Sequence, residues 1–510
     1  MRTELAIKNS IISVGGLVMQ IVLRFVLQTF FILYLGKLAL GVNGVFTNLL
    51  TLFSLSELGI GTAIVLGMYA PVAQGNTEKI ASYMHLYKKA YTIIGIVIFV
   101  VGITCLPFLP FLIKGKMIEH IYWIYLLFLL NSVVSYFFTY YRMLFTAFQK
   151  EYINVVNVTF FTILQSVLQC ITLYLTRSFI AFLLIQIICT IASNVVITHK
   201  AKTTYPEIIA AMRTAPKLLA EEKNKLKKNI FELVGAKMGG VVLNGTDMVL
   251  ISAVIGTGIA GVYSNYALIF TTIAALFSKV ISATAGNIGN LSVESDSKIG
   301  LSVFKKYYFL NLILCFFTAS CLYNMINPFI LLWIGKKFLL SEGVLLVIVL
   351  NFFTQQFRTP TLVFITSYGT LRFQGLKSVI ESILNLALSL LFLVVFKLGI
   401  AGVLLGTIVT NLLVNSWFDN LQIFHNGFQQ PVKAFLFKQY RDIGLSLLVI
   451  FCFHQVLLQL SISNPWIQLI VNGSVTVLVN SLLVFLLFRK NEHFQYFWNM
   501  IQTENRRKEV

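Results

Sequence analysis

Six long runs of this sequence, among others, contain no Asp, Glu, Lys or Arg. Each is at least as long as the roughly 20 residues that an α-helix needs to cross a membrane. The runs are Ile121–Tyr141, Tyr152–Thr176, Ser178–Thr198, Met248–Ser278, Tyr307–Gly335 and Ile443–Phe488. They do not alternate apolar and polar residues, so they do not resemble the strands of a membrane β-barrel. The pattern predicts an all-α, polytopic membrane protein.

The composition agrees with this class. Only 11% of the 510 residues are charged and 57% are hydrophobic, whereas about 25% are charged in soluble domains. A soluble enzyme, a nucleic-acid-binding protein and a disordered chain are therefore excluded. The six cysteines lie in apolar segments without a CxxC pair, which indicates packing rather than disulfides or metal ligands.

Hydropathy and charge together predict fourteen spans, with ends uncertain by several residues. The expected spans are 9–35, 42–70, 88–112, 121–145, 152–175, 178–199, 229–255, 258–289, 304–327, 340–367, 377–396, 399–424, 442–460 and 466–488. The last two share the run Ile443–Phe488, which is about twice the length of one span and is divided at Ser461–Pro465. The apolar stretch that ends near Leu35 is too long for a signal peptide and is taken as the first span.

The net charge of +20 is mainly an orientation signal. Most of the 39 Lys and Arg residues fall in the loops on the same side as the N-terminus. The opposite loops hold only Lys37, Lys114, Lys116, Arg177, Lys336, Lys337 and Lys397. Because positively charged loops stay in the cytoplasm, both termini are expected to be cytoplasmic. Cytoplasmic segments such as His493–Ile501 are amphipathic and are expected to lie at the membrane surface.

An internal repeat appears when the sequence is compared with itself at an offset of 220 residues. Lys8-Asn9 then aligns with Lys228-Asn229, Val14-Gly15 with Val234-Gly235, Gly36 with Gly256, Gly41-Val42 with Gly261-Val262 and Phe46 with Tyr266. Both copies begin on the cytoplasmic side, so the repeats are parallel and related by a pseudo-two-fold axis along the membrane normal. Chance matching of apolar segments is the alternative.

The repeat predicts two six-helix lobes followed by two additional helices. The expected segments are the N-lobe 1–199, a basic cytoplasmic linker 200–228, the C-lobe 229–424, an amphipathic loop 425–441, the last two spans within 442–488 and a cytoplasmic tail 489–510. Duplicated lobes that rock against each other can open a central cavity to one side of the membrane and then to the other. The architecture therefore favours a transporter.

Charged residues inside the spans are the candidate functional residues, because a charge at the bilayer centre costs roughly 2.5–3.5 kcal/mol on insertion scales. The cations are Arg24, Lys237, Lys279 and Arg358, and the acids are Glu57, Asp247 and Glu381. Arg24 and Lys237 lie on the first helix of each lobe and would suit an anionic group such as a phosphate. Structural roles are the alternatives: Arg24 could pair with Glu57, and Lys237, Lys279 and Arg358 could extend to the interface. The acids could bind a coupling ion or neutralise a cation.

The sequence resembles the multidrug/oligosaccharidyl-lipid/polysaccharide (MOP) flippase superfamily, and within it the Wzx-type transporters of polysaccharide repeat units. The resemblance lies in Tyr34–Gly36, Gly41–Phe46, Leu55–Ala63 and Leu398–Val403, and in the span pattern of nearly the whole chain. It implies a bacterial plasma-membrane protein that moves an undecaprenyl-diphosphate-linked oligosaccharide to the outer leaflet by alternating access. It also implies a basic cavity to which Arg24 contributes, and a groove for the lipid tail at spans 13 and 14.

The expected function is thus a flippase for capsule or exopolysaccharide synthesis, with Arg24 and Lys237 as first candidates for diphosphate contact and Arg358 and Lys279 as second ones. Its partners would be the lipid-linked oligosaccharide, membrane lipids and other polysaccharide-assembly proteins. No enzyme motif such as HExxH, GxSxG or a P-loop occurs, and no cofactor, metal or nucleic acid is expected. A flippase for lipid II or another cell-wall precursor is the nearest alternative. A membrane-embedded polymerase or glycosyltransferase is an alternative of another class.

Overall fold

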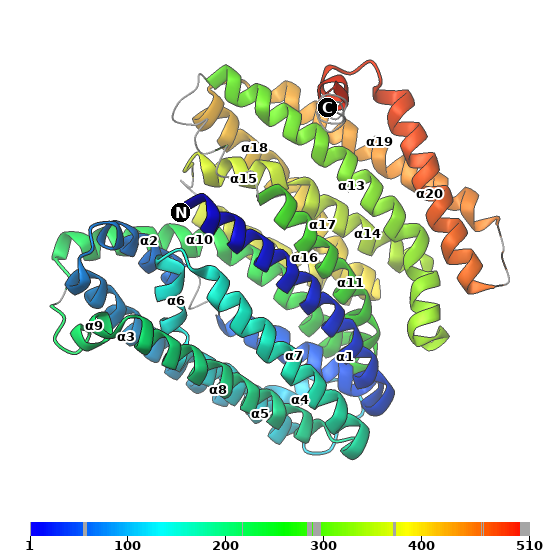
Figure 1. Ribbon diagram of the computed structural model, residues 1–510. Helices are drawn as coiled ribbons and strands as arrows, with labels where there is room; N and C mark the ends of the chain where they lie inside the picture. The colour runs from blue at the N-terminus through cyan, green and yellow to red at the C-terminus, as the bar shows by residue number, and fades with distance from the viewer. Residues whose placement is uncertain are drawn as a thin grey trace, which may run out of the picture. The chain divides into compact units, whose positions relative to one another are not determined.

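The computed structural model describes residues 2–54, 59–216, 218–282, 288, 297–370, 374–460, 462 and 464–499, which contain helices and no strand (Figure 1). Eleven of these helices are long and apolar enough to cross a membrane. Two shorter apolar helices, Ile60–Ala73 and Gly245–Ile255, add to them. The prediction of an all-α polytopic membrane protein is confirmed.

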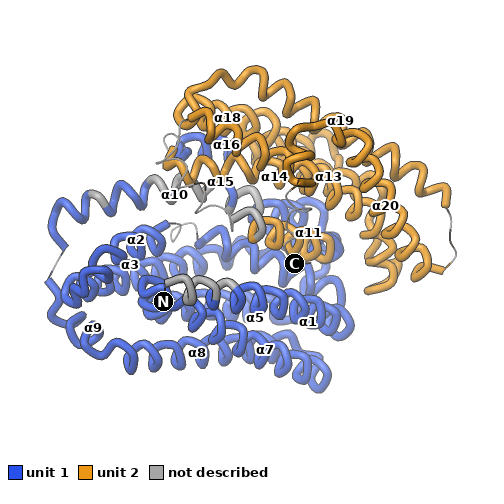
Figure 2. The backbone as a smooth tube through the Cα atoms, turned by 45° about the horizontal axis from the view of Figure 1, so that its top comes forward, with its two compact units in different colours: residues 1–264, 372–383 blue, residues 265–371, 384–510 orange. Residues whose placement is uncertain are grey.

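Unit 1 is one of two compact units, and it comprises residues 1–264 and 372–383 (Figure 2). Its α-helices are α1 (Arg2–Phe53), α2 (Ile60–Ala73), α3 (Thr77–Thr104), α4 (Leu109–Leu112), α5 (Ile121–Phe138), α6 (Tyr140–Ala147), α7 (Glu151–Thr176), α8 (Phe179–Thr204), α9 (Pro206–Ala211) and α10 (Ala220–Leu250). The 3₁₀-helix η2 (Leu106–Phe108) and the π-helix η3 (Ile251–Ile255) also belong to it. α7 packs along α1 and α8.

Unit 2 comprises residues 265–371 and 384–510. Its α-helices are α13 (Ser297–Ile334), α14 (Glu342–Phe357), α15 (Thr359–Ser367), α17 (Gly399–Thr410), α18 (Ser416–Ile423), α19 (Lys433–Leu458) and α20 (Pro465–Phe488). Between them lie the 3₁₀-helix η4 (Lys336–Phe338) and the π-helices η5 (Leu391–Val395), η6 (Asn411–Asn415) and η7 (Phe424–Phe428). Two helices, α11 (Thr257–Ser282) and α16 (Gln374–Leu390), contain residues of both units. The lobe boundaries taken from the repeat remain a prediction. The division into compact units does not show where duplicated segments begin and end.

Some expected spans coincide with one helix, and others consist of successive helical segments, such as 88–112 (α3, η2 and α4) and 399–424 (α17, η6, α18 and the start of η7). The span expected at 42–70 consists of the end of α1 and all of α2, which begins after Gly59 in the left-handed region (φ 87°). The span at 340–367 breaks at Arg358, two residues before Pro360, and so forms α14 and α15. A proline near a helix start cannot continue the preceding hydrogen-bond ladder. The span at 229–255 ends in the π-helix η3.

The two copies of the repeat make a reciprocal contact within unit 1. Gly36 and Gly256 align at the 220-residue offset and both have positive φ, 79° and 145°. A Cβ added to Gly41 would collide with the carbonyl oxygen of Thr257, and one added to Gly261 would collide with that of Lys37. The same offset relates Lys37 to Thr257 and Gly41 to Gly261, so each contact is the image of the other. A two-fold pseudosymmetry produces this reciprocity, which supports the parallel repeat in this segment.

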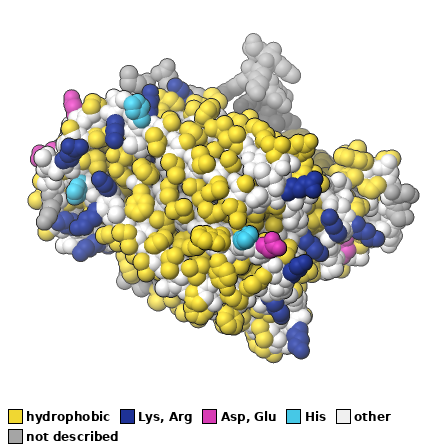
Figure 3. Space-filling model, turned by 90° about the horizontal axis from the view of Figure 1, so that it is seen from below, with side chains coloured by type: hydrophobic (Ala, Val, Ile, Leu, Met, Phe, Trp, Pro, Cys, Tyr) yellow, Lys and Arg dark blue, Asp and Glu magenta, His cyan; other side chains and the backbone are white. Residues whose placement is uncertain are grey.

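Large apolar side chains are exposed along the membrane helices. They include Leu33, Phe111, Leu175 and Leu478, each at least 68% exposed. Hydrophobic side chains dominate the face drawn in Figure 3, and Lys and Arg gather towards its margins. A soluble protein rarely exposes so large an apolar surface, whereas lipid tails cover it in a membrane.

Substitution of Gly41 or Gly261 by alanine is expected to destabilise the protein by about 1–3 kcal/mol, because the added methyl group meets backbone that cannot rotate away. Thermal unfolding in detergent, followed by intrinsic fluorescence, measures the loss. Gly258→Ala is the matched control, since nothing lies within 4 Å of the added Cβ. Equal melting temperatures for G41A and G258A would contradict the close contact.

Candidate functional site

Arg24 is an exposed cation in the middle of a membrane helix. It lies in α1, and among the described residues it has neither an ion pair nor a hydrogen-bond partner. Apolar neighbours in the sequence, Val22, Leu23 and Phe25, surround it on the helix. An unpaired guanidinium in such a segment has five N–H donors available for a carboxylate or a phosphate. Glu57, its suggested structural partner, lies outside the described residues.

Asp247 is a buried carboxyl group on α10, the first helix of the second repeat. Its side chain is only 7% exposed, and Oδ1 has no hydrogen-bond partner among the described residues. A buried carboxyl group without a partner is costly in its charged form. The position therefore suits a group that gains and loses a proton or binds a cation. Lys237 lies on the same helix, but its side chain is outside the described residues.

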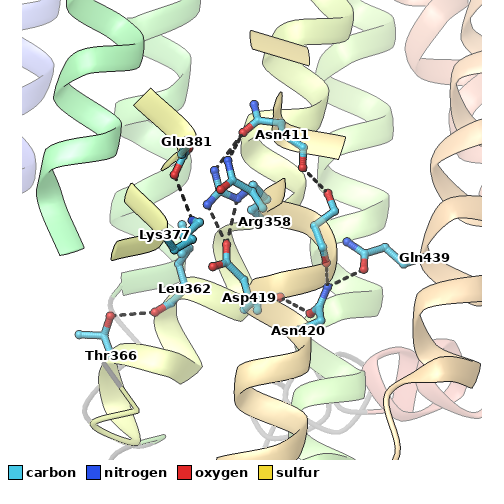
Figure 4. A network of polar contacts seen from close by, with 12 residues as sticks. Arg358, Leu362, Thr366, Lys377, Glu381, Asn411, Asp419, Asn420 and Gln439 are labelled. Carbon is cyan, nitrogen blue, oxygen red and sulfur yellow. Dashed lines mark hydrogen bonds and ion pairs between the residues drawn. The ribbon is translucent and has the colours of Figure 1, made fainter. Parts of the chain in front are cut away.

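Arg358 takes part in a polar network within unit 2 (Figure 4). Its Nη2 and Nε lie 2.7 and 3.3 Å from Oδ2 of Asp419 on α18, and its Nη1 donates to Oδ1 of Asn411 at 3.0 Å. The side chains of Arg358 and Asp419 are 12% and 2% exposed. Asn411 begins the π-helix η6, and its Oδ1 also accepts from Asn415 at 2.7 Å. Asp419 thus neutralises Arg358, and the pair is integrated into the helix packing.

The same network continues from α18 to α15 and α19. Asn420 follows Asp419, accepts at Oδ1 from the hydroxyl of Thr361 at 2.9 Å, and donates from Nδ2 to Gln439 at 2.6 Å. Such contacts satisfy the polar groups that unit 2 buries.

Glu381 forms a buried ion pair with a lysine one helical turn earlier. Nζ of Lys377 lies 3.1 Å from Oε2 of Glu381, and the two side chains are 5% and 3% exposed. Both residues belong to α16 within unit 1. This contact corresponds to the charge-balancing alternative for Glu381. Lys279, by contrast, is exposed on α11 and has no described partner.

Sequence reasoning missed three charged residues of these clusters. Asp419 lies inside an expected span, and the rule that searches spans for charge could have found it. Lys377 and Arg142 also lie inside expected spans, 377–396 and 121–145, where the same rule could have found them, and the structure places both in helices. Arg142 of α6 donates from Nη2 to Ser193 Oγ at 2.8 Å and to Asn194 Oδ1 at 3.3 Å, which ties α6 to α8.

The charges of the described spans therefore divide into two kinds. The acids Asp247, Glu381 and Asp419 are buried. Arg24 and Lys279 are exposed and unpaired among the described residues. Accessible positive charge with buried negative charge suits an anionic ligand better than a cationic one.

The structure is similar to solved transporters over nearly its full length. It matches a lipid II flippase, MurJ, in an inward closed conformation with a TM-score of 0.63, 14% identity, and coverage of 94% of this chain and 99% of that chain. A multidrug resistance MATE transporter of the MOP superfamily in an inward-facing conformation matches with a TM-score of 0.58 and 14% identity over 86% and 98% of the two chains. The Vibrio cholerae MATE transporter VcmN in its bent form matches at 0.52, with 14% identity over 87% and 99%. No protein-family model and no curated protein sequence matches.

The molecule is therefore a multi-pass membrane protein whose fold is similar to that of solved membrane transporters. More particularly, the chain has the MOP superfamily fold, which it shares with the lipid II flippase and the MATE transporters.

Replacement of Asp419 by asparagine is expected to destabilise the protein by about 3–5 kcal/mol, because it leaves the Arg358 guanidinium buried without its counter-charge. The double variant Arg358→Met/Asp419→Leu should recover much of that loss, since it removes both charges. Denaturation in detergent gives the free energy of unfolding of the wild type, the single variant and the double variant. A single variant as stable as the wild type would contradict a structural role for the pair.

Proposed function

We propose that this protein is a flippase that moves undecaprenyl-diphosphate-linked oligosaccharide repeat units from the inner to the outer leaflet of a bacterial plasma membrane. It would serve capsule or exopolysaccharide synthesis, with both termini in the cytoplasm and alternating access as its mechanism. The observation that carries the proposal is Arg24, an exposed cation without a described partner in an apolar helix of a fold shared with a lipid II flippase.

The chemistry of the cargo follows from the charges. A diphosphate head is anionic, and a guanidinium binds phosphate oxygens through two parallel N–H donors. Arg24 would contact the diphosphate, Lys237 would assist, and Lys279 would attract it. Arg358 would contribute indirectly, since Asp419 already occupies two of its nitrogens. A drug exporter for organic cations would instead need an accessible carboxylate on its cargo path. Asp247, Glu381 and Asp419 are buried, and the accessible Glu342 is paired with His454.

The last two helices fit a role beside the lipid tail. One face of α20 is apolar and exposed, with Ile470, Leu478, Leu482 and Leu486 each at least 53% exposed. Its other face carries Asn472, Thr476 and Asn480, which are buried. An apolar face of this kind can accompany a polyprenyl chain while the head group crosses.

A flippase for lipid II is the second candidate function, and the observation that favours it is the full-length match to MurJ at a TM-score of 0.63. The two cargoes share the diphosphate and differ in the sugar. A leaflet-resolved assay in proteoliposomes with defined lipid-linked sugars separates them. Transport of lipid II but not of an oligosaccharide unit would replace the first proposal by the second.

Arg24→Ala is expected to reduce lipid-linked sugar translocation at least tenfold, because the diphosphate loses a charge-assisted contact of about 1.5–3 kcal/mol. Arg24→Lys should retain part of the rate, since it keeps the charge and loses the planar fork. The rate is measured in proteoliposomes that contain equal amounts of protein. Arg177→Asn is the control, because Arg177 is exposed in a left-handed turn where asparagine is tolerated. Unchanged translocation by R24A would remove Arg24 from the cargo site.

A coupling role for Asp247 makes a separate prediction. Asp247→Asn keeps the shape but cannot release a proton or hold a cation tightly, so the dependence of the rate on an imposed ion gradient should disappear. Downhill exchange of the cargo should continue. The initial rate with and without a gradient checks this, and a gradient response equal to that of the wild type would leave Asp247 with a packing role.

A further inference from the structure

A cavity in unit 2 is lined by residues that the proposed cargo site does not use. Its volume is about 340 Å³, and its walls come from the ends of α13, α14, α19 and α20. These ends adjoin the loops at 335–341 and 459–464, which the charge rule assigns to the outer side of the membrane. Its polar lining includes Asn327, Glu342, His454, Gln468 and Asn472.

His454 is the buried base of this cavity. Its side chain is 5% exposed, and its ring stacks on Tyr323 with centroids 3.7 Å apart. Nδ1 lies 2.8 Å from Oδ1 of Asn324. The Asn324 amide is itself oriented, because its Nδ2 donates to the hydroxyl of Thr476 at 3.1 Å. Since an amide oxygen only accepts, Nδ1 carries a hydrogen and donates it.

The second nitrogen of the ring faces a carboxylate. Nε2 of His454 lies 3.3 Å from Oε2 of Glu342, the first residue of α14. The other carboxylate oxygen accepts from Nδ2 of Asn327 at 2.8 Å. Oδ1 of Asn327 in turn accepts from the hydroxyl of Tyr266 at 2.7 Å. Nε2 has no hydrogen-bond partner among the described residues, so a second hydrogen placed on it would face the carboxylate and turn this contact into an ion pair.

Solvent can reach this pair through the carboxylate. Glu342 is 47% exposed and lines the cavity, whereas the imidazole behind it is buried. The titratable groups of the lining that face His454 are Glu342 on α14 and Tyr323 on α13; the α20 residues of the lining, Gln468 and Asn472, are neutral. Oδ1 of Asn472 is buried without a partner among the described residues, so it can accept from water in the cavity.

We propose that His454 and Glu342 form a proton-binding site that exchanges with the solution outside the membrane. A proton from that solution binds the neutral imidazole at Nε2, and the resulting imidazolium pairs with Glu342. His454 ties α19 to α13 through Asn324 in both states, and the bound proton adds a tie to α14 through Glu342, which is released when the proton is lost. His454 lies on α19, beyond the expected duplicated set, whereas Glu342 lies on α14, within it. This inference rests on the proposed flippase function: binding of a proton at the His454–Glu342 site links cargo movement to a proton gradient.

The direct test measures the protonation state of the His454 imidazole by nuclear magnetic resonance. Protein labelled with ¹⁵N-histidine is reconstituted in lipid, and the His454 signals are assigned by their loss in His454→Gln. Between pH 8 and pH 5.5, Nε2 should change from unprotonated to protonated while Nδ1 stays protonated. Glu342→Gln should move that transition to lower pH, because the imidazolium loses its counter-charge. An Nε2 that remains unprotonated at pH 5.5 would overturn the site.

Stability supplies a second readout. The ion pair exists only while the imidazole is protonated, so it stabilises the protein at low pH and is lost as pH rises through the imidazole titration. The melting temperature of the wild type should therefore exceed that of His454→Gln by more at pH 6 than at pH 8. His425→Gln replaces an exposed histidine of the same unit and serves as control. A difference that does not vary with pH would contradict the proton-dependent tie.

A transport assay can distinguish failure of the proton-coupling inference from failure of the proposed flippase function. In proteoliposomes that contain a lipid-linked sugar, an imposed proton gradient should change the translocation rate of the wild type and leave that of H454Q unaffected; an equal sodium gradient should have no such effect. Equal responses of the two proteins to the proton gradient would overturn the link to cargo movement. A wild type that moves none of the lipid-linked sugars under any gradient would overturn the flippase function, and the titration of His454 would still stand.

Discussion

Neutralisation of charge in a low-dielectric interior is the constraint on which this structure depends. A buried charge is tolerated only beside its counter-charge, with its remaining hydrogen-bonding groups satisfied. Arg358 meets Asp419 and Asn411 in unit 2, and Lys377 meets Glu381 in unit 1. The Arg358–Asp419 pair joins two helices, and the Lys377–Glu381 pair stabilises a single helix, α16. Arg24 and Lys279 are exposed and have no partner among the described residues, and they are the charges that we propose meet the ligand.

Helices in the hydrocarbon region gain little from burying apolar side chains against one another, because lipid is as apolar as leucine. Close backbone approach and polar contacts must therefore specify how they pack. Within unit 1 this role falls to the glycines at positions 41 and 261. Within unit 2 it falls to asparagines: Asn324 joins α13 to α19 and α20, and Asn420 joins α18 to α15 and α19.

The membrane class and the approximate helix positions could be predicted from the sequence because they depend on local composition, whereas the two-lobe repeat stays a prediction. An uncharged run of more than 20 residues has few alternatives to a spanning helix. The pairing of charges could not be predicted in the same way, because Asp419 is 61 residues from Arg358 and their meeting depends on how α14 and α18 are rotated. Lys377 and Arg142 lie at or near the ends of expected spans, the least certain part of a hydropathy reading, and so were not counted among the membrane charges. His454 gave no signal, since its partners Tyr323, Asn324 and Glu342 come from two other helices, α13 and α14. Glu57 and the Lys237 side chain lie outside the described residues, so their roles stay predictions.

The reciprocal glycine contact also has a consequence for how the two copies can diverge after duplication. Each copy supplies a glycine without a Cβ, Gly41 or Gly261. It also supplies the backbone carbonyl, of Lys37 or Thr257, that packs against the other copy's glycine. A side chain added at either glycine therefore collides with the backbone of the other copy. No change of side chain can relieve this collision, because the opposing atoms belong to the main chain. Substitutions elsewhere in the two segments can leave this contact intact, whereas both Gly41 and Gly261 must lack a Cβ for it to form.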